Sequence, residues 1–68
     1  MDDEVLNMSV RRFLKKLGVT AQREIELAVR EQLDAGRLAE EKTLSARATV
    51  SVQGLPNEIV VTDEIELS

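Results

Sequence analysis

The chain has 68 residues, of which 43% are hydrophobic and 32% charged, with a formal net charge of -4. Such a short chain forms one small domain, residues 1–68, because it buries only about 60% of the surface that its unfolded form exposes. It contains no cysteine or histidine, which excludes disulfides and argues against a structural zinc site. Small domains without these staples often depend on self-association, so a homodimer is one expected state.

The distribution of apolar and charged residues indicates a cytoplasmic protein. No apolar run approaches the roughly 20 residues of a membrane span, so we expect no membrane insertion. The N-terminus is acidic, with Asp2, Asp3 and Glu4, where a secretory signal would be basic. Charge is uneven, since residues 11–19 carry +4 in a chain that is acidic elsewhere.

The first predicted element is a helix over residues 3–17. Its apolar residues recur every three or four positions, which is the pattern of a helix with one buried face. These residues are Leu6, Val10, Phe13, Leu14 and Leu17. Gly18 follows as the expected left-handed cap that ends the helix.

A second helix is predicted over residues 21–35. Thr20 is a suitable N-cap, and Gly36 is expected to stop the helix. The apolar positions are Ile25, Ala28, Val29 and Leu33. Because only about two residues would join the two helices, they are expected to fold back on each other as a helical hairpin.

The remaining residues predict a β-hairpin with strands at 44–53 and 58–67. Apolar and polar residues alternate in "LSARATVSVQ", as in a half-buried strand, and "GLPN" has turn composition. A four-residue loop would place Gln53 opposite Glu58. In this register Arg47 faces Glu64, Thr49 faces Thr62 and the apolar residues share one face.

Asp63 is the one residue that does not fit this register, since it falls on the apolar face opposite Ala48. A bulge at residues 62–64, an exposed strand edge or a partner for the carboxylate would each explain it, and a bulge is the commonest of these. The fold class is thus α+β, a two-helix hairpin followed by a C-terminal antiparallel β-hairpin (α-α-β-β). The hairpin should cover the helices, and its free edge could extend the sheet in a dimer.

The stretch "RRFLKKLGVTAQREIE" invites comparison with a DNA-reading helix-turn-helix. Two positions disagree with that motif. Leu14 lies where a small residue is needed, and Glu24 lies where an apolar one is needed. The second helix would also present a net negative surface to the phosphates.

The candidate binding site is a basic patch of Arg11, Arg12, Lys15 and Lys16. Their spacing puts all four on one face of the first helix, away from its apolar residues. One interpretation is a solvated face at a helix C-terminus, where cations are favoured. The other is a docking patch for an acidic partner, a nucleic-acid backbone or an anionic membrane surface.

No catalytic, cofactor-binding or metal-binding residues are predicted. Without histidine or cysteine, no nucleophile and base are paired, and no group of acids has the spacing of a calcium or magnesium loop. We therefore expect a protein that is not an enzyme and uses no cofactor.

The segment "VLNMSVRRFLKKLGVTAQREIELAVREQLDAGRL", with the later "TLSARATVSV", resembles a family of short uncharacterised proteins found in proteobacteria. The resemblance covers nearly the whole chain, and "VRRFLKKLGVTAQREIE" is its most specific part. It implies a free-standing bacterial domain of unknown function, and it implies no activity.

The predicted function is non-enzymatic binding, in which a small adaptor uses either the basic patch or an exposed hairpin edge. Its partner is a protein or a second copy of the chain. The alternative is a diverged winged-helix-like nucleic-acid-binding regulator, in which the hairpin is a wing and the basic face lies on the phosphates.

Overall fold

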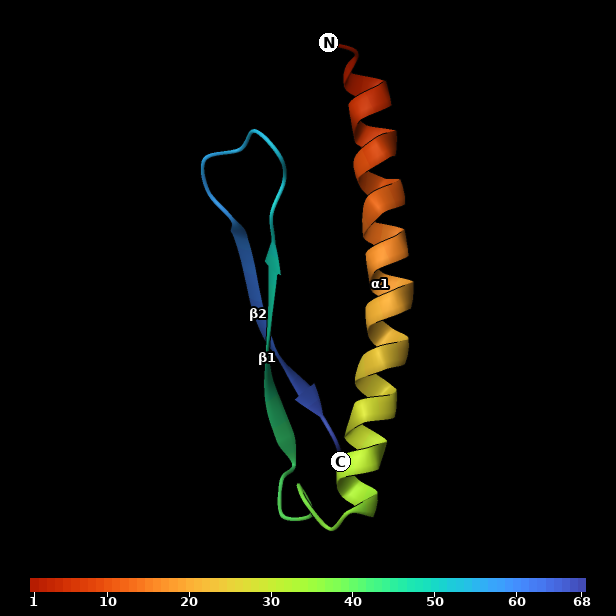
Figure 1. The fold of residues 1–68 in the computed structure, drawn as a ribbon, viewed down its shortest axis with the longest axis vertical. Coiled ribbons are helices and arrows are strands. Elements are labelled where there is room, and N and C mark those ends of the chain that lie inside the picture. Colours follow the sequence, from red (N-terminus) through yellow and green to blue (C-terminus); the bar gives the residue numbers. More distant parts are fainter. The chain divides into compact units, whose positions relative to one another are not determined.

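The structure is a computed structural model that describes residues 1–68. It contains one helix, α1 (Asp3–Asp34), and two strands, β1 (Thr43–Val50) and β2 (Ile59–Glu66), as Figure 1 shows. The chain divides into two compact units, Met1–Leu38 and Ala39–Ser68, which are described separately. The predicted α+β class is confirmed in this coarser form, one helix followed by an antiparallel two-stranded sheet.

The start of α1 is set by Asp2. Its carboxylate oxygen Oδ1 accepts hydrogen bonds from the backbone N–H groups of Glu4 at 2.9 Å and Val5 at 3.2 Å. These donors have no partner inside the helix, so an N-cap of this kind stabilises the helix by about 1 kcal/mol. Asp3 and Glu4 add negative charge to the first turn, which favours the positive end of the helix dipole.

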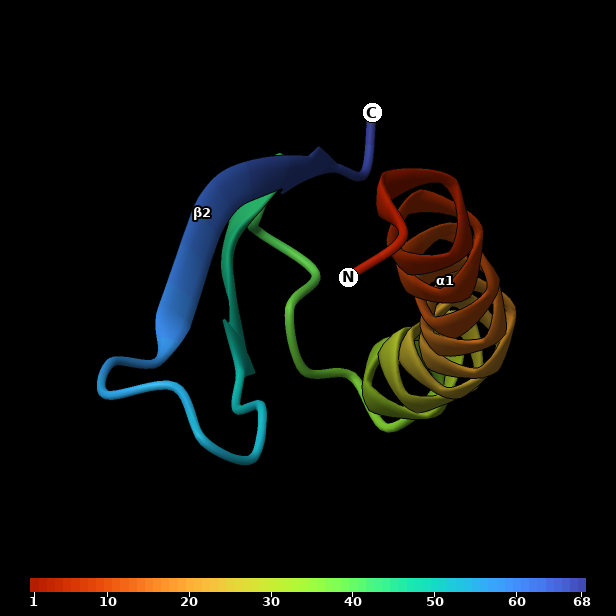
Figure 2. The same cartoon turned by 90° about the horizontal axis from the view of Figure 1, so that it is seen from above.

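The predicted two-helix hairpin is wrong, because the two expected helices are parts of α1. Its 32 residues run through Gly18 and Thr20 without a turn, and the coil is unbroken in both Figure 1 and Figure 2. A glycine inside a helix costs about 1 kcal/mol relative to alanine, which weakens a helix but does not end it. Gly18 has helical geometry, whereas a C-terminal cap glycine needs a positive φ.

One apolar stripe runs along α1 and explains why the helix continues. Its members recur eleven residues apart, as in Leu6, Leu17 and Ala28, and eleven residues make three helical turns. Leu6, Leu17 and Ala28, which come from both sides of Gly18 in the sequence, therefore lie on one side of α1. Val29 and Leu33, which were predicted on the apolar face of a second helix, do not lie on this side. The apolar stripe consists of Leu6, Val10, Phe13, Leu14, Leu17, Ala21, Ile25 and Ala28.

The end of α1 confirms the prediction that Gly36 stops a helix. Gly36 has a φ of 80°, and Ala35 is the C-cap. The N–H of Arg37 donates to the carbonyl of Gln32 at 2.9 Å, and the N–H of Gly36 donates to that of Leu33 at 3.0 Å. This pair of bonds is the Schellman motif, which depends on a residue that tolerates the left-handed conformation.

The strands pair antiparallel from Thr43 opposite Glu66 to Val50 opposite Ile59. The predicted strand limits, 44–53 and 58–67, differ from the observed ones by one to three residues. The predicted register is wrong by two residues, because the loop takes three residues from the end of the predicted first strand and only one from the start of the second. A shift of two residues keeps every side chain on its predicted face, since the side-chain period of a strand is two. Leu44 and Val50 therefore still share a face with Ile59 and Ile65.

The loop between the strands contains a turn that needs Gly54. The N–H of Leu55 donates to the carbonyl of Val52 at 3.1 Å, and Gly54 has a φ of 90°, as a type II turn requires at this position. The hydroxyl of Ser51 donates to Oε2 of Glu58 at 2.6 Å, so side chains join the strands just beyond the last backbone pair.

Asp63 lies in regular pairing opposite Ala46, so the predicted bulge at residues 62–64 is wrong. Its side chain is exposed, and Oδ1 accepts the N–H of Glu64 at 2.7 Å. The carboxylate thus has solvent and a local donor, and the ladder accommodates it without an extra residue.

We predict opposite effects for alanine at two glycines of this unit. Gly18→Ala should raise the free energy of unfolding by about 1 kcal/mol, because the site is helical and no atom lies within 4 Å of an added Cβ. Gly36→Ala should lower it by roughly 1–2 kcal/mol, because an L-residue is strained at positive φ. Urea unfolding followed by circular dichroism measures both. A destabilising Gly18→Ala would show that the helix ends there.

Candidate functional site

All four residues of the basic patch lie on α1, and all are exposed. Arg11 and Lys15 are one turn apart, as are Arg12 and Lys16, so the four guanidinium and ammonium groups project from two successive turns. The structure thus brings the predicted site residues together on one helix.

The position of the basic patch along α1 removes its simplest structural explanation. Cations are favoured in the last turn of a helix, where unpaired carbonyls carry partial negative charge. The last turn of α1 contains no basic residue, and the patch lies well inside the helix, between its first turns and its midpoint. The patch is therefore not at a helix C-terminus, although its four residues are exposed to solvent as that interpretation expects.

The basic patch is also unbalanced by acids on its own helix. Side chains three or four residues apart are neighbours on a helix surface. No Asp or Glu lies at these distances from any of the four, whereas Arg12 has Lys15 and Lys16 as neighbours. Each such like-charge pair destabilises a helix by roughly 0.2–0.5 kcal/mol. The patch therefore reduces the stability of the helix that presents it.

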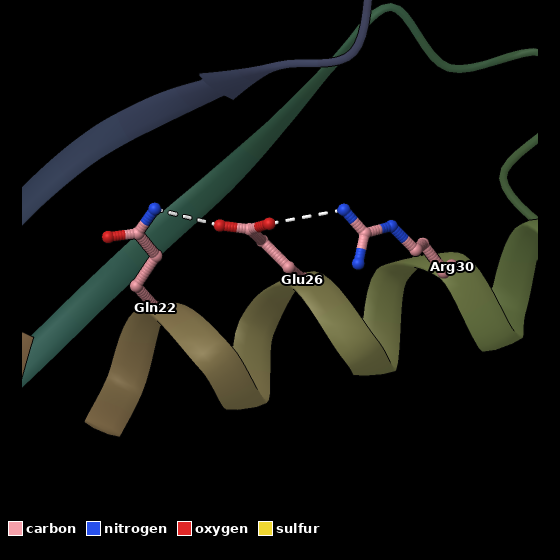
Figure 3. A network of polar contacts seen from close by, with 3 residues as sticks. All are labelled: Gln22, Glu26 and Arg30. Atoms are coloured by element: carbon pink, nitrogen blue, oxygen red, sulfur yellow. Dashed lines mark hydrogen bonds and ion pairs between the residues drawn. The ribbon is translucent and has the colours of Figure 1, made fainter. Parts of the chain in front are cut away.

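The second half of α1 contains a polar network that sequence reasoning missed. Nε2 of Gln22 donates to Oε2 of Glu26 at 2.8 Å, and Nη2 of Arg30 donates to Oε1 of Glu26 at 3.2 Å. Figure 3 shows the three side chains in a row on one side of the helix. The signal in the sequence that could have predicted this network is the spacing of four residues between its successive members.

Comparison with this network shows what is unusual about the basic patch, namely that its cations have no acidic partner. Gln22 and Glu26 lie eleven residues after Arg11 and Lys15, so they continue the same face of α1. There the Arg30 side chain, 71% exposed, has an acidic partner, and this is the one ion pair within α1. The four cations of the basic patch have none, although the helix has the same geometry along its length.

The hairpin has an open hollow lined by five polar side chains and one alanine. The lining residues are Ser45, Ala46, Arg47, Thr62, Asp63 and Glu64. The predicted cross-strand pair of Arg47 with Glu64 is wrong, because Arg47 lies opposite Thr62 and Glu64 opposite Ser45. A hollow open to solvent does not shield a bound molecule from water.

No stretch of α1 is apolar enough for the helix to cross a membrane. A family model described as "Family of unknown function (DUF6494)" matches residues 1–68 of the chain. The chain belongs to the DUF6494 family. The predicted resemblance to a family without known function is confirmed, and membership of DUF6494 brings no activity with it. No curated protein and no solved structure matches the chain.

We predict that reversing one charge of the basic patch stabilises the protein. In Arg12→Glu, two like-charge neighbours are replaced by favourable pairs with Lys15 and Lys16, which should raise the free energy of unfolding by on the order of 1 kcal/mol. Arg30→Glu is the matched control and should lower it, since it breaks the pair with Glu26. Thermal unfolding measures both. A destabilising Arg12→Glu would mean that the patch serves folding.

Proposed function

We propose that this member of DUF6494 is a non-enzymatic binding protein that docks an acidic protein segment through the basic patch. The supporting observation is that four exposed cations share one face in the interior of α1 with no acidic neighbour on the helix. A patch that weakens its own helix is explained if an external partner supplies the missing negative charge.

The size and chemistry of the basic patch favour a protein partner over nucleic acid. From Arg11 to Lys16 the helix rises only about 8 Å, which suits a short acidic segment. The net charge of -4 opposes the approach of a long polyanion such as DNA more than that of a short acidic segment, which carries fewer charges. The patch contains no aromatic residue on which bases could stack.

The winged-helix alternative loses its structural basis. That motif needs a turn between two helices and a separate recognition helix. α1 continues through the residues where the turn was expected, so no such recognition helix exists.

A second route to binding is addition of a strand to β1. The sheet has only two strands, so each has a free backbone edge. β2 contains three carboxylates, at Asp63, Glu64 and Glu66, which discourage pairing, whereas Arg47 is the one charged residue of β1. An extended partner segment, or β1 of a second copy, could therefore pair with β1. We propose that either mode of binding takes place in the bacterial cytoplasm.

Nuclear magnetic resonance titration tests this function. A glutamate-rich peptide added to labelled protein at low salt should shift the amide signals of residues 11–16, and added salt should reverse the shifts. Arg12→Gln with Lys16→Gln should weaken binding roughly two- to thirtyfold, from two exposed charge pairs. Arg23→Gln with Arg30→Gln removes the same charge from the same helix and should weaken it much less.

The outcomes of this titration separate the alternatives. Shifts confined to residues 43–50 would assign binding to the β1 edge. Shifts at residues 11–16 with mixed-sequence duplex DNA, but not with the peptide, would assign the patch to nucleic acid. Signals at residues 11–16 that do not move with either probe would contradict the proposal.

A further inference from the structure

The apolar stripe of α1 is a second surface that the proposed function does not use. No residue of α1 is buried, and Leu6, Phe13 and Leu14 are 47%, 48% and 49% exposed. An apolar row of this length marks an interaction surface, because soluble proteins rarely leave one open to water. The charged residues on either side of the stripe decide which kind of partner it suits.

One segment of α1, residues 5–23, is basic as well as amphipathic. It contains five cations and no Asp or Glu, although the chain as a whole is acidic. Acids return at Glu24, which lies on the same side of the helix as the apolar stripe, so the basic amphipathic segment ends at Arg23. A basic amphipathic helix is typical of segments that lie on anionic membrane surfaces.

The basic patch borders the N-terminal part of the apolar stripe, from Leu6 to Ala21, on both sides. With about 100° of rotation per residue, Arg11 and Lys16 point about 110° to either side of the middle of this part. The other two cations of the patch point about 150° from it, again one on each side. A helix whose stripe faces a flat apolar layer therefore has one cation at the same height on each flank. Long apolar stems let these two charged ends reach lipid phosphates.

An anionic bilayer also differs from DNA in how it meets the net charge of -4. Glu4 and Glu24 are the acids of α1 nearest to the basic patch along the chain. They lie about 10 Å and 12 Å along the helix axis from Arg11 and Lys16, which is about one Debye length at physiological salt, so their repulsion is screened. The bilayer in addition has an apolar layer that takes up the stripe, and DNA has none.

We propose that residues 5–23 of α1 lie on an anionic lipid surface, with the apolar stripe facing the acyl chains and Arg11 and Lys16 bound to lipid phosphates. This goes beyond the proposed function and does not depend on it. Arg12 and Lys15 point away from the lipid, so two cations of the basic patch stay open to an acidic protein segment.

Co-sedimentation of the full-length protein with lipid vesicles tests the proposal. Vesicles containing about one third phosphatidylglycerol should bind at least tenfold more tightly than vesicles of phosphatidylcholine alone, and salt should weaken the binding. Arg11→Gln with Lys16→Gln should weaken it about twentyfold, because each cation at the surface contributes about fivefold. Arg12→Gln with Lys15→Gln removes the same charge from the same two turns and should weaken it less.

A second pair of variants tests which face of α1 meets the lipid. Leu14→Gln changes the apolar stripe, whereas Met8→Gln changes a residue that is 69% exposed on the opposite face. Leu14→Gln should weaken binding to anionic vesicles about tenfold, from the lost burial of one large apolar side chain. Met8→Gln should change it less than twofold. Circular dichroism without lipid checks that both variants keep the helix.

Three results would overturn the proposal. The first is wild-type protein that does not bind anionic vesicles at low salt, a result that needs no variant to fold. The second is equal binding to neutral and anionic vesicles, and the third is an equal loss for Leu14→Gln and Met8→Gln. Vesicle binding without shifts from the glutamate-rich peptide would contradict only the proposed function, and the reverse result would contradict only the lipid surface.

Discussion

The structure of this chain depends on one constraint, the unbroken phase of the apolar stripe across Gly18. Because Leu6, Leu17 and Ala28 are each three turns apart, continuing the helix keeps all of them on one side, while a turn at Gly18 would separate them. The glycine weakens the helix by about 1 kcal/mol but leaves every backbone hydrogen bond available. Both surfaces of α1 follow from this, since the same continuity that forms a long apolar stripe places the basic patch far from either helix end.

In the hairpin, a small change in the loop is enough to change the register of the two strands that it joins. The turn at Gly54 and the bond from Ser51 to Glu58 occupy eight residues between the strands, where the shortest closure would use four. The register of the two strands therefore differs by two residues from the one that the four-residue closure would give, and every side chain stays on the same face of the sheet. Of the two strands, β2 contains three carboxylates, whereas β1 contains one charged residue, Arg47.

Features that depend on neighbouring residues could be predicted from the sequence, and features that depend on competition between distant signals could not. The acidic start of the helix, the stop at Gly36 and the apolar faces of both strands follow from capping and alternation. Taken alone, Gly18 is a good signal for a helix end and Thr20 for a helix start. Only the periodicity of the apolar residues, which continues from one side of Gly18 to the other, outweighs these local signals. The predicted strand register was wrong because the alternation of apolar and polar residues does not determine which residues form the loop. The basic patch was found from spacing alone, but its position within the helix required the structure.

The central claim is that α1 is continuous, and the distance between its two halves tests it most directly. Spin labels at Met8→Cys and Arg30→Cys, in protein diluted with unlabelled chain, report this distance by pulsed electron paramagnetic resonance. A continuous helix places the two backbone positions about 33 Å apart. A helical hairpin with a turn at Gly18 would bring them to roughly 10–15 Å, the separation of packed helices. A narrow distribution near the longer distance is the predicted result, and one near the shorter distance would contradict the account.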